Sequence, residues 1–124
     1  MMNKPINIQE QFFKFSDFWS PHIIGQINDT FIKVAKLKGS FTWHSHAKED
    51  ELFFIIKGNL RIEFENKSVN LKKGDLFVVP KGVLHNPVAK KECHVLLIEK
   101  TSTKHMGKVK TSKTKSVKEQ LRKL

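Results

Sequence analysis

Four residues in the middle of the chain have the types and spacing of a metal site, namely His44, His46, Glu51 and His85. His44 and His46 are two residues apart in a segment that we predict to be a strand, so both side chains share one face. Glu51 opens the next predicted strand, and a hairpin can return it beside the histidines. His85 follows the turn at Pro80-Lys81-Gly82. Three imidazoles and one carboxylate suit a divalent transition metal that keeps positions open for water or substrate.

Other interpretations of these residues stay open on spacing alone. Histidines two apart can lie on an exposed strand face, and a single histidine is most often structural or solvated. Glu49 and Asp50 compete with Glu51 for the carboxylate role, because side-chain alternation cannot be carried across a loop.

The elements that must position these residues are short β runs bounded by turn residues. The clearest alternation places Leu60, Ile62 and Phe64 on a buried strand face and the charged residues between them on a solvent-facing one. Many short strands with regular turns predict an antiparallel sandwich or small barrel. The predicted strands are Ile23–Gln26, Thr30–Leu37, Phe41–His46, Glu51–Ile56, Leu60–Glu65, Ser68–Leu71, Leu76–Val79 and Cys93–Glu99.

Short helices are predicted at the two ends of the barrel sequence. Asn7 can cap a helix over Asn7–Phe15. Ser116 and Glu119 form a capping-box pattern that begins a second helix. Nine residues make a marginal helix alone, so we expect it to dock on the body or on a dimer mate.

One predicted strand is apolar on both faces. From Leu52 to Ile56 every residue is apolar, whereas a single barrel has only one interior. The second cover must be the N-terminal helix or another subunit, and we predict a homodimer.

Composition and charge limit the classes of function. The 124 residues fit one domain, with 23 basic and 12 acidic residues giving +11. Residues 100–124 hold nine basic residues and one acidic residue, so the excess is mostly in the tail. No aromatic residue follows Phe77, which weighs against a nucleic-acid-binding tail. The apolar runs are too short for a membrane span, no secretion signal is visible, and the single Cys93 favours a reducing cytoplasm.

Two motifs in this order resemble the cupin superfamily. Gly39-x4-His44-x-His46-x4-Glu51-x6-Gly58 is similar to the first cupin motif, and Gly74-x5-Pro80-x-Gly82-x2-His85 is similar to the second. The first motif has four residues before its first histidine where five are frequent, and Ala89 stands where the second motif often has Asn.

The resemblance implies an all-β fold, a double-stranded β-helix or cupin jelly-roll barrel with short N-terminal and C-terminal helices. It implies His44, His46, Glu51 and His85 as metal ligands, and it selects Glu51 through the six-residue gap to Gly58. We therefore divide the chain into an N-terminal helix and lead-in (1–22), the barrel (23–99) and a basic tail (100–124).

The expected function is that of a metal-binding small cupin. The metal would be Mn, Fe, Ni, Zn or Cu, and Glu51 would be a ligand and a mobile base in oxygenase- or isomerase-like chemistry on a small oxygenated or anionic substrate. The chain resembles cupins labelled mannose-6-phosphate isomerase-like and, more faintly, 3-hydroxyanthranilate dioxygenases. The alternative is a non-catalytic small-molecule binding or sensor cupin. We expect His22 and His105 on the surface, and His94 in a core or interface.

Overall fold

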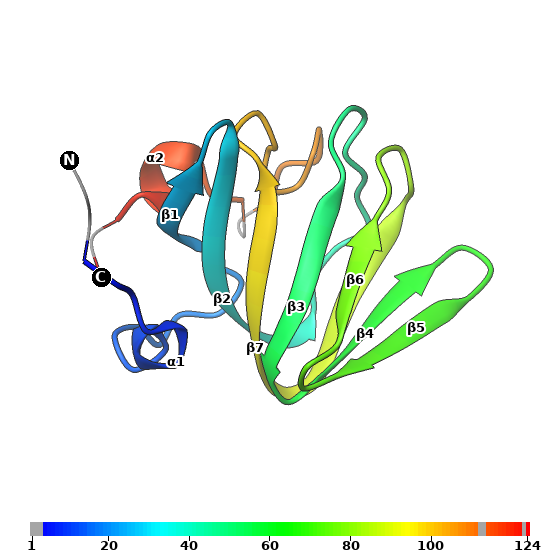
Figure 1. Cartoon of the computed structure of the whole chain (residues 1–124). Helices are drawn as coiled ribbons and strands as arrows, with labels where there is room; N and C mark the ends of the chain where they lie inside the picture. Colours follow the sequence, from blue (N-terminus) through cyan, green and yellow to red (C-terminus); the bar gives the residue numbers. More distant parts are fainter. Residues whose placement is uncertain (1–3, 112–113, 123) are drawn as a thin grey trace.

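The computed structural model describes residues 4–111, 114–122 and 124, and in that part of the chain an antiparallel sheet curls into an open barrel (Figure 1). The strands are β1 (His22–Ile27), β2 (Thr30–Ser40), β3 (Glu51–Lys57), β4 (Asn59–Phe64), β5 (Ser68–Lys72), β6 (Leu76–Val79) and β7 (His85–Lys100). The helices are α1 (Ile8–Gln11) and α2 (Val117–Gln120). The predicted all-β fold with short flanking helices is confirmed.

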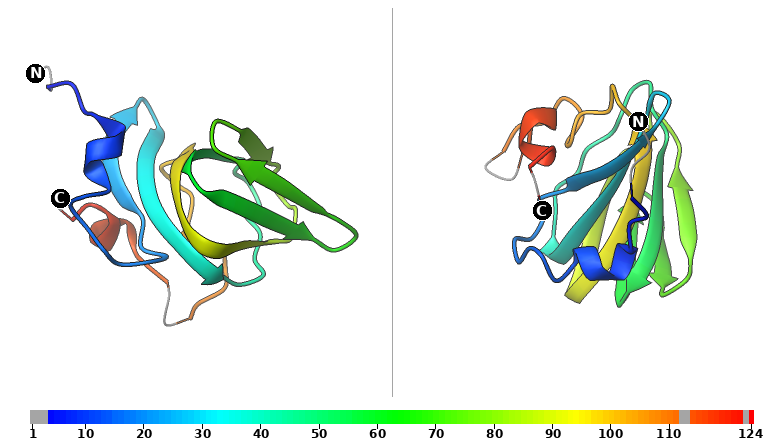
Figure 2. Two further views of the ribbon diagram at one scale, coloured as in Figure 1. Left: turned by 90° about the horizontal axis from the view of Figure 1, so that it is seen from below. Right: turned by 60° about the vertical axis from the view of Figure 1, so that its left-hand side comes forward.

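Strand β7 pairs with three other strands, β2, β3 and β4. Residues 94–99 of β7 pair with both β2 and β3, and residues 85–88 pair with β4. The main sheet has the order β1-β2-β7-β3-β6, and the β4–β5 hairpin lies against the other end of β7 (Figure 2). Both predicted cupin-motif segments therefore meet around this one long strand.

The barrel interior is apolar, as the alternation predicts. Phe53 and Ile55 from β3 face Leu60 and Ile62 from β4, and all four side chains are buried. Gly58 joins the two strands with a φ of +85°, and a Cβ there would lie 2.9 Å from a backbone oxygen of β7. Only glycine fits that turn without displacing β7.

A second apolar cluster covers part of the outer sheet face. Phe12, at the end of α1, packs with Val34 and Leu96, and Phe54 and Ile56 join them from β3. The N-terminal helix therefore supplies one of the two covers predicted for the doubly apolar strand.

Several predicted elements differ from the structure. The C-terminal helix, predicted at nine residues, spans only Val117–Gln120. The helix predicted over Asn7–Phe15 spans only Ile8–Gln11, although Asn7 caps it. The final strand extends back to His85. The strand predicted over Phe41–His46 is wrong. Strand β2 continues to Ser40 and pairs with β7, and the residues that follow it make only isolated backbone contacts, such as the bridge between His44 and His85.

The basic tail docks on the body. Ser116 and Glu119 form the predicted capping box, and the Gln120 side chain of α2 is buried. Within the described residues, no helix has the length and apolar character needed to cross a membrane.

Candidate metal centre

His44 and His85 are brought together by a pair of backbone hydrogen bonds. The amide of His44 donates to the carbonyl oxygen of His85 at 3.0 Å, and the amide of His85 donates to the carbonyl oxygen of His44 at 2.9 Å. This isolated bridge, and not a continuous strand, sets the two rings with centroids 4.4 Å apart. His46 follows on the same loop, with its ring centroid 5.1 Å from that of His44.

Backbone carbonyls orient two of the rings. His44 Nδ1 lies 3.0 Å from the carbonyl oxygen of Thr42, and His85 Nδ1 lies 2.9 Å from that of Val83. A carbonyl only accepts, so each Nδ1 carries the proton and each Nε2 keeps a lone pair. Metal-bound histidines in proteins are held in this way.

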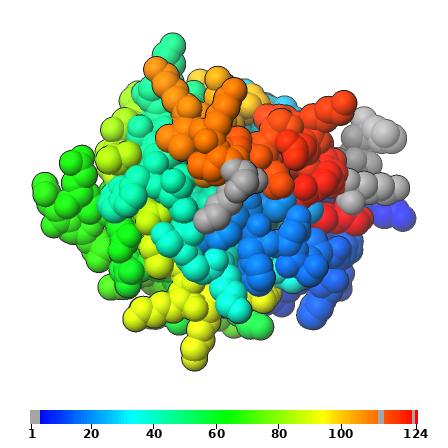
Figure 3. All heavy atoms as spheres, turned by 180° about the vertical axis from the view of Figure 1, so that it is seen from behind, coloured from blue at the N-terminus to red at the C-terminus, as the bar shows by residue number. Residues whose placement is uncertain are grey.

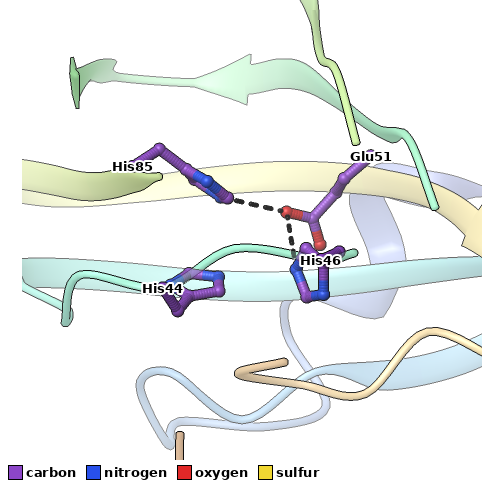
Figure 4. Close-up of side chains that lie close together, drawn as sticks. All are labelled: His44, His46, Glu51 and His85. Atoms are coloured by element: carbon purple, nitrogen blue, oxygen red, sulfur yellow. Dashed lines mark ion pairs between the residues drawn. The ribbon is translucent and has the colours of Figure 1, made fainter. Parts of the chain in front are cut away.

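Glu51 completes the cluster from the first position of β3. Its Oε1 lies 3.8 Å from His46 Nε2 and 3.7 Å from His85 Nε2 (Figure 4). One ligand atom from each of the four residues lies within 4.8 Å of all the others, and the four residues are buried. Donors that each lie about 2.1 Å from one ion are about 3–4 Å apart, so a small inward movement would suit a single metal.

The cluster contains buried polar atoms that lack hydrogen-bond partners among the described residues. They include both ring nitrogens of His46 and Nε2 of His85. An unpaired buried polar atom costs stability, and a metal ion would satisfy these lone pairs. The residues therefore fit a divalent transition metal.

Burial keeps the rings in the neutral form that binds metals. Burial and the neighbouring histidine lower the pKa of His44 and that of His46 to about 4 each. Burial also lowers the pKa of His85. At neutral pH these rings therefore offer lone pairs without first losing a proton.

Sequence reasoning missed a buried polar chain behind Glu51. Glu99 of β7 is the ladder partner of Glu51, and Lys33 of β2 forms an ion pair with Glu99. Burial and the Glu51 carboxyl raise the pKa of Glu99, against the opposing effect of Lys33. Burial likewise raises the pKa of Glu51. The two carboxyls can thus hold a proton between them. The sequence did contain a signal for this polar chain. Lys33 on β2 and Glu99 on β7 each lie two residues from a buried apolar residue of the same strand.

Two other histidines lie where the sequence reasoning did not expect them. His22 is 4% exposed beside Asp17, and His105 is half-buried with its ring centroid 5.1 Å from that of Phe41, so the surface prediction is wrong for both. Burial and then Lys33 lower the pKa of His105 to about 3. His94 stacks on Phe12 outside the barrel and is buried, which confirms its core position.

The interior next to the cluster is a cavity of about 30 Å³. Its lining includes His44, Glu51 and His105, together with Phe41 and Phe53. A much larger groove of about 750 Å³ lies outside the barrel along β4, β5 and β7, and it contains none of the four cluster residues. Of these two spaces, only the small cavity is lined by cluster residues, namely His44 and Glu51.

Comparisons with known proteins agree on one family. The family model described as a cupin domain matches residues 31–99. The crystal structure of a cupin-2 domain containing protein from Shewanella frigidimarina is 42% identical, with a TM-score of 0.76 over 77% of this chain and 93% of that chain. Protein NMB1881 from Neisseria meningitidis is 30% identical, with a TM-score of 0.72 over 78% of this chain and 99% of that chain.

The curated relatives match over shorter stretches. The uncharacterized protein YdbB of Bacillus subtilis is 38% identical over 63 residues, which are 50% of this chain and 56% of that protein. Germin-like protein subfamily 3 member 4 of Arabidopsis thaliana is 44% identical over 52 residues, 38% of this chain and 25% of that protein. The chain thus spans about half of the length of YdbB and about a quarter of the length of the germin-like protein.

Proposed function

We propose that this chain, which belongs to the cupin domain family, is a metal-dependent enzyme acting on a small oxygenated or anionic substrate. The observation that carries the proposal is the set of four buried donors with ligand atoms within 4.8 Å of one another. His44, His46, Glu51 and His85 would hold Mn, Fe, Ni, Zn or Cu, and the metal would polarise an oxygen of the substrate.

The net charge of such a site favours an oxygen ligand. Three neutral imidazoles and one carboxylate leave a divalent ion at +1 in a buried setting, where charge is weakly screened. Glu51 would be the catalytic residue, because its carboxyl can pass a proton to or from substrate while Glu99 holds it in place. Phe41, Phe53 and the other apolar lining residues would exclude water.

Metal analysis of untagged protein tests the first half of the proposal. We expect about one transition-metal ion per chain, and its loss in the double variant His44→Ala with His46→Ala. His94→Ala is the matched control, because that histidine lies outside the barrel against Phe12. Metal-free wild type, or equal metal in the double variant, would refute the metal site.

Turnover tests the second half. The test is a substrate screen that follows oxygen uptake and isomer formation. Glu51→Gln should lower the activity per bound metal ion, whereas Lys57→Gln, at the other end of β3, should leave it unchanged. A specific observation favours the alternative of a binding or sensor cupin: a cavity of about 30 Å³ has room for about one or two waters. Tight ligand binding without turnover would select that alternative.

The homodimer is part of the proposal. Leu76 and Val78 on β6 are 59% and 42% exposed, and they continue the apolar outer face that α1 only partly covers. A second copy laid on this face would bury them, as expected for an isologous interface. Light scattering should give a dimer that Leu76→Lys with Val78→Lys converts to a monomer; a monomeric wild type at micromolar concentration would refute it. A cytoplasmic location, where Cys93 stays reduced, completes the proposal.

A further inference from the structure

The C-terminal segment packs against the loop that carries two of the four cluster residues. Residues 101–111 lie across the loop that carries His44 and His46, as Figure 3 shows from behind. Met106 is fully buried, and a Cβ on Gly107 would lie 2.0 Å from the carbonyl oxygen of Ser45. Ser102 Oγ donates to Glu49 Oε2 at 3.2 Å on the same side. A tail that was merely solvated would not make contacts this close.

This segment places His105 in the wall of the cavity, together with His44 and Glu51. The backbone amide of Lys115 donates to His105 Nδ1 at 2.9 Å. That nitrogen must therefore be unprotonated, and the ring proton is on Nε2. His105 thus has the tautomer opposite to that of His44, whose proton is on Nδ1. At Nε2, His105 therefore offers a hydrogen-bond donor, whereas His44 and His85 each offer a lone pair.

A buried chain of contacts fixes that donor in place. Lys33 donates to the side-chain oxygen of Gln120, and Gln120 Nε2 donates to the carbonyl oxygen of Lys115 at 3.0 Å. Lys33 also forms an ion pair with Glu99, the ladder partner of Glu51 on β7. The segment that orients His105 is therefore anchored inside the barrel.

We propose that His105 is a ligand-contacting residue of the site, donating a hydrogen bond from Nε2 to a small anion or oxygen ligand bound beside His44 and Glu51. The inference rests on the proposed metal site and adds what the tail does there. The cavity of about 30 Å³ then limits the ligand to a few atoms. Selectivity for small hydrogen-bond acceptors follows from this arrangement.

Azide binding to the cobalt-loaded protein tests the inference. Azide is a small anion that accepts hydrogen bonds, and visible absorbance of Co²⁺ reports its binding. A hydrogen bond to a charged acceptor is worth enough that His105→Leu should weaken azide binding about tenfold or more. His105→Gln keeps a donor and should restore most of the affinity. The matched control is His94→Leu, because that ring lies outside the barrel.

The outcomes separate this inference from the proposed function. If wild type takes up no cobalt, the metal site fails and the inference fails with it. If cobalt binds equally in all variants and His105→Leu binds azide as tightly as wild type, only the role of His105 is overturned.

A measurement on wild type covers the case in which a variant fails to fold. In the zinc-loaded protein, ¹⁵N spectra of the histidine side chains, assigned by residue, should show the His105 ring protonated at Nε2, with signals that shift with azide. A His105 ring protonated at Nδ1, or His105 signals that do not shift with azide, would refute the inference.

Discussion

Acid should destabilise the metal-free protein through the buried histidines, and the effect can be isolated at His46. Its folded pKa of about 4 lies below the ordinary value of 6.5, so the unfolded chain binds the proton more readily. Stability that is present above pH 6.5 is therefore lost as the pH falls towards 4. The loss at this one residue is about 2 kcal/mol by pH 5 and about 3 kcal/mol by pH 4.

Two carboxyls act in the opposite direction. The folded pKa values of Glu51 and Glu99 are raised, so their contribution falls as the pH rises above about 4.5. The difference in unfolding free energy between wild type and His46→Gln largely cancels the contribution of Glu51 and Glu99, because both proteins keep these two carboxyls.

The assay is guanidinium unfolding at a series of pH values with a chelator present. Between pH 7 and pH 5, wild type should lose about 2 kcal/mol more unfolding free energy than His46→Gln. His44→Gln should give a similar difference, since its ring also has a folded pKa of about 4. Parallel pH profiles for wild type and both variants would refute the claim that these rings are buried and neutral.

Three further predictions concern the docked tail, the thiol and the outer face. Gly107→Ala should loosen the tail by clashing with Ser45, seen as faster tryptic cleavage at Lys108 and Lys110 with the barrel intact; unchanged cleavage would contradict the close approach. Cys93 is fully buried and its pKa is raised to about 12 by burial, so a thiol reagent should label it only on unfolding; rapid labelling of folded protein would contradict this. Phe12→Ala should lower the unfolding free energy by about 3 kcal/mol, against little change for the 90% exposed Phe13→Ala; equal effects would refute the packing of α1.

The sequence allowed much of the barrel to be predicted, because side-chain alternation reports directly which face is buried. Leu60 and Ile62 alternate with charged residues, and both proved to be in the interior. The doubly apolar strand likewise required two covers, of which the N-terminal helix is one. Strand ends were less accurate, since the final strand continues through Pro87 back to His85.

The candidate ligands meet for a reason that local patterns could not give. His44 and His46 converge on a loop held by one bridge to His85, whereas alternation along a strand was the expected cause. Their role as metal ligands stays a prediction. Lys33 and Glu99 were missed because the pairing of distant strands decides which charges meet inside a barrel.

His105 shows the same limit at the tail. We expected His105 on the surface because it lies in a lysine-rich segment, and composition carries no information about tertiary docking. A few buried contacts around Met106 and Gln120 decide where the segment lies.

The position of β7 has a consequence for how the chain is made. Ala35 pairs with Val95 about 60 residues later, and β3 and β4 also need β7 as a partner. On the ribosome, β2 and β3 would therefore emerge with unpaired edges and wait several seconds for the last strand at about 5–20 residues per second. Closure of such long loops slows folding. The nascent chain is then most exposed to aggregation just before β7 leaves the exit tunnel, which makes the barrel dependent on its final strand in time as well as in space.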